Sequence, residues 1–122
     1  HPLRKRKLIS FEECLEYDFV GLNRGSSLLE LTSRNAEKLG KKMRHRIQVR
    51  SYDAMCQMIA VNLGIGVLPH QACATQIKAM GLKTVQLSDP WAKRNLLLAM
   101  KTNTTQLPAA TLLSQHLLGL SR

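Results

Sequence analysis

Residues 46–69 read RIQVRSYDAMCQMIAVNLGIGVLP and contain the pattern of strand, helix and strand that decides the fold. Ile47 and Val49 alternate with polar residues, which is the period of a strand with one buried face, so the basic side chains there are expected to point outward. Ile65–Leu68 is a short apolar run bounded by glycine and proline. Such a run is expected of a strand that is buried on both faces of a parallel sheet.

The segment between these two strands has the pattern of a helix with one apolar face. Ser51 stands at the N-cap position, and Asp53 in the first turn is favourable to the helix dipole. Apolar residues then recur at four-residue steps, at Met55, Ile59 and Leu63. Gly64 is expected to end the helix.

The same alternation continues on both sides of this unit. Helices are predicted over Phe11–Tyr17, Ser27–Leu39, Gln71–Met80 and from Pro108 to Gly119. Strands are predicted over Asp18–Leu22, Val85–Leu87 and Leu96–Met100. Capping-box spacings of Ser10 with Glu13 and of Ser27 with Glu30 mark the starts of the first two helices. This order favours an α/β domain with helices on both faces of a mostly parallel sheet.

Composition excludes several classes of protein. The chain has 122 residues, of which 44% are apolar, as in one ordinary globular domain and unlike collagen, a disordered chain or a disulfide-rich miniprotein. Its apolar runs are far shorter than the roughly 20 residues that span a bilayer, so no membrane segment is predicted. Cys14, Cys56 and Cys73 fit neither a disulfide framework nor a zinc site. They are expected to be reduced, buried thiols in a cytoplasmic protein.

The net charge of +10 raises two alternatives for the basic residues. They gather in residues 4–7 and 38–50, with no phenylalanine or tyrosine interleaved. A solvated basic face is therefore favoured over phosphate binding, because charge alone gives only nonspecific affinity for nucleic acid. A small basic nucleic-acid-binding α/β protein remains the alternative function.

Two turns carry the residue types of an anion-binding site. Gly25, Ser26 and Ser27 precede one predicted helix, and Ser51 and Tyr52 begin another. Each turn places a hydroxyl group and free backbone N–H groups at a helix N-terminus, and ligands of such sheets sit at the carboxyl ends of strands. The competing interpretation is that these serines only cap their helices.

No catalytic or cofactor motif accompanies these turns. Gly64 and Gly66 lack the third glycine of a dinucleotide-binding loop, and they follow a helix instead of opening one. A phosphate-binding loop, a histidine pair with metal spacing and a nucleophile elbow are all missing from the sequence. We therefore expect a protein that is not an enzyme and that has no metal ion or cofactor.

Several segments together have the order of a known family. The chain opens with His1, Pro2 and Leu3, a basic turn and a helix led by Ser10. The most specific stretch, residues 61–69, matches a family pattern of valine, two small residues, Gly-x-Gly, hydrophobic residues and proline, although Asn62 and Leu63 replace the small pair. A strand after Gly81-Leu82, a returning strand at 94–100 and the closing helix also fit. Nearly the whole chain thus resembles the C-terminal half of a LysR-type transcriptional regulator.

The resemblance implies part of a two-lobed effector-sensing domain with the type II periplasmic-binding-protein architecture. Residues 1–90 would form most of the second lobe, and residues 91–122 would supply a strand at the hinge and a C-terminal helix that returns to the first lobe. The DNA-reading domain would lie in a part of a bacterial cytoplasmic regulator that this sequence does not contain.

The resemblance also implies where the small-molecule effector binds and how the regulator assembles. Ser51 and Tyr52, with Ser26 and Ser27, would hold a small anion in the interlobe cleft. Val67, Leu68 and Pro69 would form an apolar wall. The helix Ser27–Leu39 and the strand Arg46–Arg50 would lie in or near a homodimer contact, because sensor domains of this family pair side by side.

Overall fold

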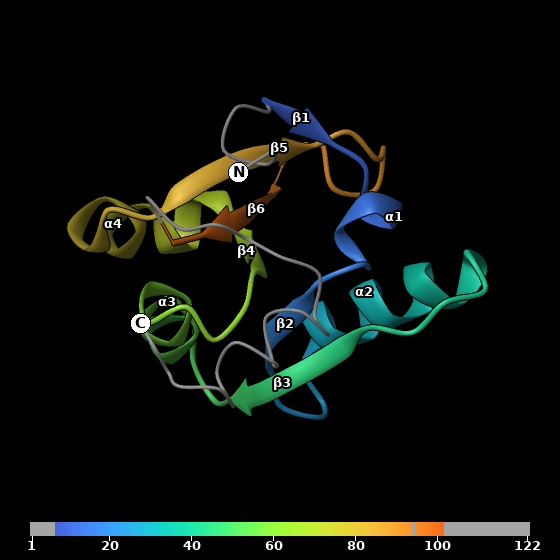
Figure 1. Ribbon diagram of the computed structural model, residues 1–122, viewed down its shortest axis with the longest axis horizontal. Coiled ribbons are helices and arrows are strands. Elements are labelled where there is room, and N and C mark those ends of the chain that lie inside the picture. Colours follow the sequence, from blue (N-terminus) through green and yellow to red (C-terminus); the bar gives the residue numbers. More distant parts are fainter. Residues whose placement is uncertain (1–6, 94, 102–122) are drawn as a thin grey trace, which may run out of the picture.

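The computed structural model describes residues 7–93 and 95–101 of the chain. Its elements follow in the order β1 (Leu8–Ile9), α1 (Phe11–Cys14), β2 (Asp18–Leu22), α2 (Ser27–Lys38), β3 (Arg44–Val49), α3 (Tyr52–Ala60), β4 (Gly66–Pro69), α4 (His70–Met80), β5 (Lys83–Leu87) and β6 (Leu96–Met100) (Figure 1). Helices and strands alternate as predicted from α1 to β5, whereas the short strand β1 was not predicted. The helix predicted from Pro108 lies outside the described residues.

The strands form a mixed sheet in two parts. Four strands pair in the order β1-β5-β6-β4, and β2 pairs with β3. A bridge between Phe19 and Ile65 joins the two parts, since the Val20 N–H donates to the Ile65 carbonyl at 2.8 Å and the Ile65 N–H donates to the Asp18 carbonyl at 3.0 Å. The β1–β5 and β2–β3 pairs are parallel.

The direction of β6 corrects the expectation of a mostly parallel sheet. This strand is antiparallel to both of its neighbours, β4 and β5. Only the short segment 88–95 separates β5 from β6, and it is too short for the crossover of a dozen or more residues that a parallel neighbour requires. The chain therefore turns back on itself, and all five residues of β6 are buried.

Helices cover both faces of the sheet, as predicted. Figure 1 shows α3 and α4 on one side of the strands and α1 and α2 on the other. The helices α3 and α4 pack on each other and on β4 and β6, and α2 packs on β2. The core between these layers is largely aliphatic, with the rings of Phe11 and Phe19 among its largest fully buried side chains.

Serine caps begin three of the helices. The capping box of Ser10 and Glu13 is confirmed, but α1 is shorter than predicted because it ends at Cys14. The prediction that Ser51 caps α3 is also confirmed. The second predicted capping box is wrong by one residue, because the N-cap of α2 is Ser26 and Ser27 is already helical.

The end of α3 also differs from the prediction. The helix stops at Ala60, and Asn62 has the left-handed conformation, with φ 66°, that was expected of a glycine. Gly64 serves a different purpose, since a Cβ atom there would lie 2.8 Å from the Asp18 carbonyl oxygen. It allows the chain that enters β4 to approach the backbone of β2.

A bulge in β3 changes the faces of its side chains. Phe19 pairs with His45 but Val20 pairs with Ile47, so Arg46 has no partner residue on β2. Alternation therefore shifts by one residue, and Arg46 is half-buried instead of pointing fully outward as predicted.

Candidate functional site

The turns that follow β2 and β3 lie side by side at one edge of the sheet. The two strands are parallel, with Leu22 opposite Val49, so their carboxyl ends coincide. Just beyond this pair, the Asn23 N–H donates to the Val49 carbonyl at 2.8 Å. The N-termini of α2 and α3 thus start from adjacent turns, which brings Ser26 and Ser27 to the same edge as Ser51 and Tyr52.

Both cap hydroxyl groups accept a hydrogen bond from their own helix. The Leu29 N–H donates to Ser26 Oγ at 3.0 Å, and the Ala54 N–H donates to Ser51 Oγ at 3.0 Å. A hydroxyl group that accepts such a bond still has its own proton to donate. Capping and anion binding are therefore compatible at each serine.

Charged side chains surround these turns. Arg24 and Arg50 are exposed; Arg50 stands immediately before the N-cap Ser51, and Arg24 stands two residues before the N-cap Ser26. In the turn after β2, Gly25 has the left-handed backbone conformation, with φ +90°. In the first turn of α3, Asp53 accepts a hydrogen bond from the Gln57 side chain at 3.1 Å. Sequence reasoning missed both arginines, although their position beside a capped helix N-terminus was a usable signal.

The helix α4 packs against α3, and its residue Cys73 lies near Tyr52 in the first turn of α3. Burial, and then the nearby Cys73 thiol, raise the pKa of Tyr52. Burial also raises the pKa of Cys73 to about 12, and the Cys56 thiol adds to this increase. All three cysteines of the chain are buried and free, as predicted. The thiols of Cys56 and Cys73 thus lie together in the contact between α3 and α4.

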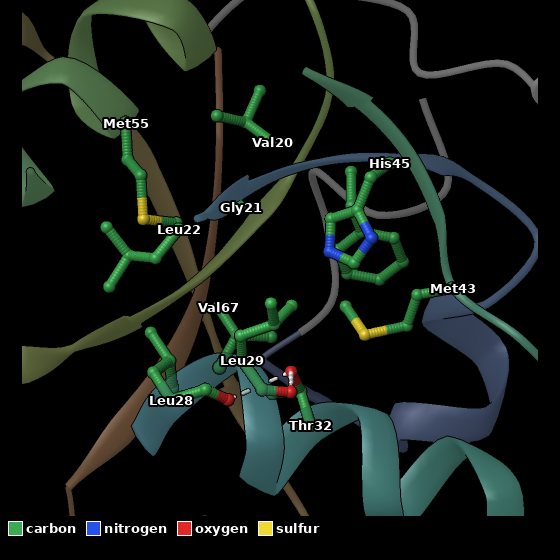
Figure 2. A pocket seen from close by; sticks show the side chains of 11 residues that line it. Val20, Gly21, Leu22, Leu28, Leu29, Thr32, Met43, His45, Met55 and Val67 are labelled. Atoms are coloured by element: carbon green, nitrogen blue, oxygen red, sulfur yellow. Dashed lines mark hydrogen bonds between the residues drawn. The ribbon is translucent and has the colours of Figure 1, made fainter. Parts of the chain in front are cut away.

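The three residues expected to form an apolar wall lie on β4. Val67 and Leu68 are only 3% and 0% exposed, and Pro69 is half-buried at the N-cap of α4. Val67 shares the lining of a small cavity with Leu28 and Leu29, which belong to the first turn of α2 (Figure 2). Contact of the three residues with an effector stays a prediction, and of the three only Val67 lines this cavity beside the α2 turn.

That cavity has a volume of only about 10 Å³ and is too small for an organic effector. His45 lies in it over Gly21, as Figure 2 shows, and its Nε2 atom is buried without a hydrogen-bond partner among the described residues. Burial lowers the pKa of His45. Sequence reasoning missed this residue, although a glycine inside a predicted strand often marks the close approach of another group.

The part of the chain that the structure describes contains neither a candidate metal site nor a candidate membrane-spanning helix. Within 7–93 and 95–101, histidine, cysteine and acidic side chains form no cluster of three that could hold a metal ion. In the same part of the chain, every helix is too short or too polar to cross a bilayer. The candidate site is the edge where β2 and β3 end, because two serine-capped helices begin there.

Comparison with known proteins agrees with the geometry. The family model of the LysR substrate binding domain matches residues 1–121. No curated protein matches the chain. The family match covers nearly the entire sequence, including the strand–turn–helix units that carry the candidate site. The chain belongs to the LysR substrate binding domain family.

Proposed function

We propose that this chain is the effector-sensing part of a bacterial LysR-type regulator and that it binds a small anionic molecule in an interlobe cleft. Residues 1–90 form the second lobe in this proposal, and residues 91–122 return to the first. DNA is bound by another domain of the regulator, in the cytoplasm. The role is binding and not catalysis, in keeping with the family.

One observation carries the proposal for the site. The hydrogen bond from Asn23 to Val49 joins the end of β2 to the end of β3, so that the two serine-capped helices begin at the same edge of the sheet. Each N-terminus has about half a positive charge, and an anion beside it gains roughly 0.3–1 kcal/mol from the dipole at an exposed site. Two such ends, with Arg24 and Arg50 next to them, favour a carboxylate over a neutral ligand.

The basic residues of α2 and β3 are assigned to a subunit contact in this proposal, and not to effector binding. Arg44 forms an ion pair with Asp18 at 3.9 Å, and Lys41 forms one with Glu12 at 3.7 Å. These basic side chains of the α2–β3 region contribute to the surface of the domain. We propose that the same region, α2 with β3, lies in or near the homodimer contact of the full regulator.

Replacement of the cap hydroxyl tests the site. Ser51→Ala should weaken binding of the effector to the full regulator by about tenfold, which corresponds to about 1.4 kcal/mol, as measured by isothermal titration calorimetry. Ser10→Ala is the matched control, because Ser10 also caps a helix but lies at α1, away from these turns. Both variants lose a cap and should lose similar stability, about 1 kcal/mol. Equal effector affinity in the two variants would limit Ser51 to capping.

A further inference from the structure

A second, larger pocket lies beside α4 in the four-stranded part of the sheet. It is open, has a volume of about 320 Å³, and is lined by Lys7, His70, Lys83, Thr84, Gln86, Leu96 and Leu97. The serine-capped turns follow β2 and β3, which belong to the two-stranded part. None of the residues proposed for the effector site lines this pocket, so the two sites are separate.

Elements from distant parts of the chain build the pocket. Thr84 and Gln86 alternate along β5 and therefore share one face, and Gln86 pairs with Leu97 of β6. The Gln86 N–H donates to the Lys7 carbonyl at 3.2 Å, which places Lys7 next to β5. The His70 N–H donates to the Asn95 carbonyl at 2.7 Å and fixes the start of α4 beside β6.

The Gln86 side chain gives the pocket a fixed wall. Its Nε2 atom lies 3.3, 3.0 and 3.4 Å from the carbonyl oxygens of Leu87, Lys93 and Leu96, respectively. The amide N–H groups are thus committed to the protein backbone. The polar side-chain groups of the lining that remain for a ligand are the Gln86 Oε1 atom, two ammonium groups, an imidazole and the Thr84 hydroxyl.

The lining combines positive charge with an apolar floor. Every ionisable residue among the seven is basic. The ion pairs within residues 7–93 and 95–101 use other cations, Lys41 and Arg44, so Lys7 and Lys83 are not neutralised by a described carboxylate. Leu97 pairs with Gln86 and so shares its face of the sheet, and although it is only 7% exposed it contributes apolar surface to the lining. The volume is at the lower end of the range for small-molecule sites.

We propose that this pocket binds a compact organic carboxylate. Lys7 and Lys83 hold the carboxylate group, and the apolar body of the molecule rests on Leu97. An inorganic anion would use the charges but leave the apolar floor uncovered, and a neutral molecule would leave both lysines without a partner. Charge and apolar surface together therefore select the class of ligand.

Benzoate is a suitable probe of this class, and its binding to the 122-residue chain can be followed by nuclear magnetic resonance. We expect saturable shifts of the backbone amides of Thr84, Gln86 and Leu97. Benzamide, which has the same shape without the charge, and inorganic phosphate, which lacks the apolar body, should each bind at least tenfold more weakly. Equal binding of either probe, or no saturable shift with benzoate, would overturn the proposal.

Variants locate the bound anion. The double substitution Lys7→Gln and Lys83→Gln should raise the dissociation constant of benzoate at least tenfold. Lys78→Gln is the matched control, because Lys78 is an exposed lysine of α4 that does not line the pocket, and it should change the constant less than twofold. Shifts confined to residues 23–27 and 50–52 would refute this pocket while favouring the effector site, so the two proposals fail separately.

Discussion

Gly21 and His45 form a steric pair whose coupling can be measured by unfolding experiments. A Cβ atom added at Gly21 would lie 2.6 Å from Cδ2 and 2.7 Å from Nε2 of the His45 ring. Both distances are well inside normal contact, so in Gly21→Ala the imidazole has to leave its place in the cavity below α2. This variant tests whether His45 occupies the space that is free because Gly21 has no side chain.

The expected magnitude follows from two opposing effects. Overpacking of a well-packed region costs about 1–3 kcal/mol. Alanine is otherwise favoured over glycine inside a strand by roughly 0.5–1 kcal/mol. Gly21→Ala should therefore reduce the free energy of unfolding by about 0.5–2 kcal/mol while His45 is present. In a His45→Ala background the clash is removed, and the same substitution should stabilise the protein.

The assay is urea unfolding of the four proteins of this double-mutant cycle, followed by circular dichroism. The coupling energy should be about 1–3 kcal/mol, which corresponds to several degrees in Tm for a domain of this size. A coupling energy below about 0.5 kcal/mol, the level at which independent sites add, would refute the packing described for His45. Stabilisation by Gly21→Ala in the presence of His45 would refute it as well.

Three further predictions concern pH, assembly and DNA. Burial lowers the pKa of His45, so protonation of this residue favours the unfolded chain. The contribution of neutral His45 to stability is therefore complete above the unfolded pKa of about 6.5, and it is lost progressively as the pH falls below that value. Urea unfolding at pH 7.5 and 5.5 should show a smaller loss in His45→Gln than in the unsubstituted chain. Charge reversal at Arg46 and Arg50 should weaken self-association of the full regulator in sedimentation experiments, and unchanged association would place the subunit contact elsewhere. The 122-residue chain should bind duplex DNA only weakly, with a strong dependence on salt and no sequence preference, and tight specific binding in a gel-shift assay would favour the alternative of a nucleic-acid-binding protein.

Local signals were sufficient for most of the fold. Ser51 followed by Asp53 predicted the start of α3, and Gly81, with φ 63°, ends α4 as its position predicted. Local signals failed where two residues of the same type compete. Ser26 and Ser27 are both acceptable cap residues, and the spacing to Glu30 favoured Ser27. In the structure Ser26 is the N-cap, since its backbone is extended and Ser27 is already helical.

Long-range contacts account for what the sequence did not predict. The bulge beside Arg46 accompanies the approach of His45 to Gly21, two residues that lie far apart along the chain. Asn62 adopts the left-handed conformation after α3, while Gly64 lies at the close contact with the Asp18 backbone. The meeting of the two serine turns could be predicted, because the carboxyl ends of parallel strands lie at the same edge. The partial burial of Arg46 could not be predicted, since one extra residue in β3 reverses the alternation of its side chains.

The central position of β6 has a consequence for how the sheet forms as the chain is synthesised. Its two neighbours, β4 and β5, make no pair with each other, and both bond to this strand. Until residues 96–100 leave the ribosome, the backbone N–H and C=O groups of β4 and β5 that bond to β6 have no partner in this strand. The four-stranded part therefore cannot be completed before this wholly apolar strand is available, and unpaired strand edges are where a nascent chain is exposed to aggregation.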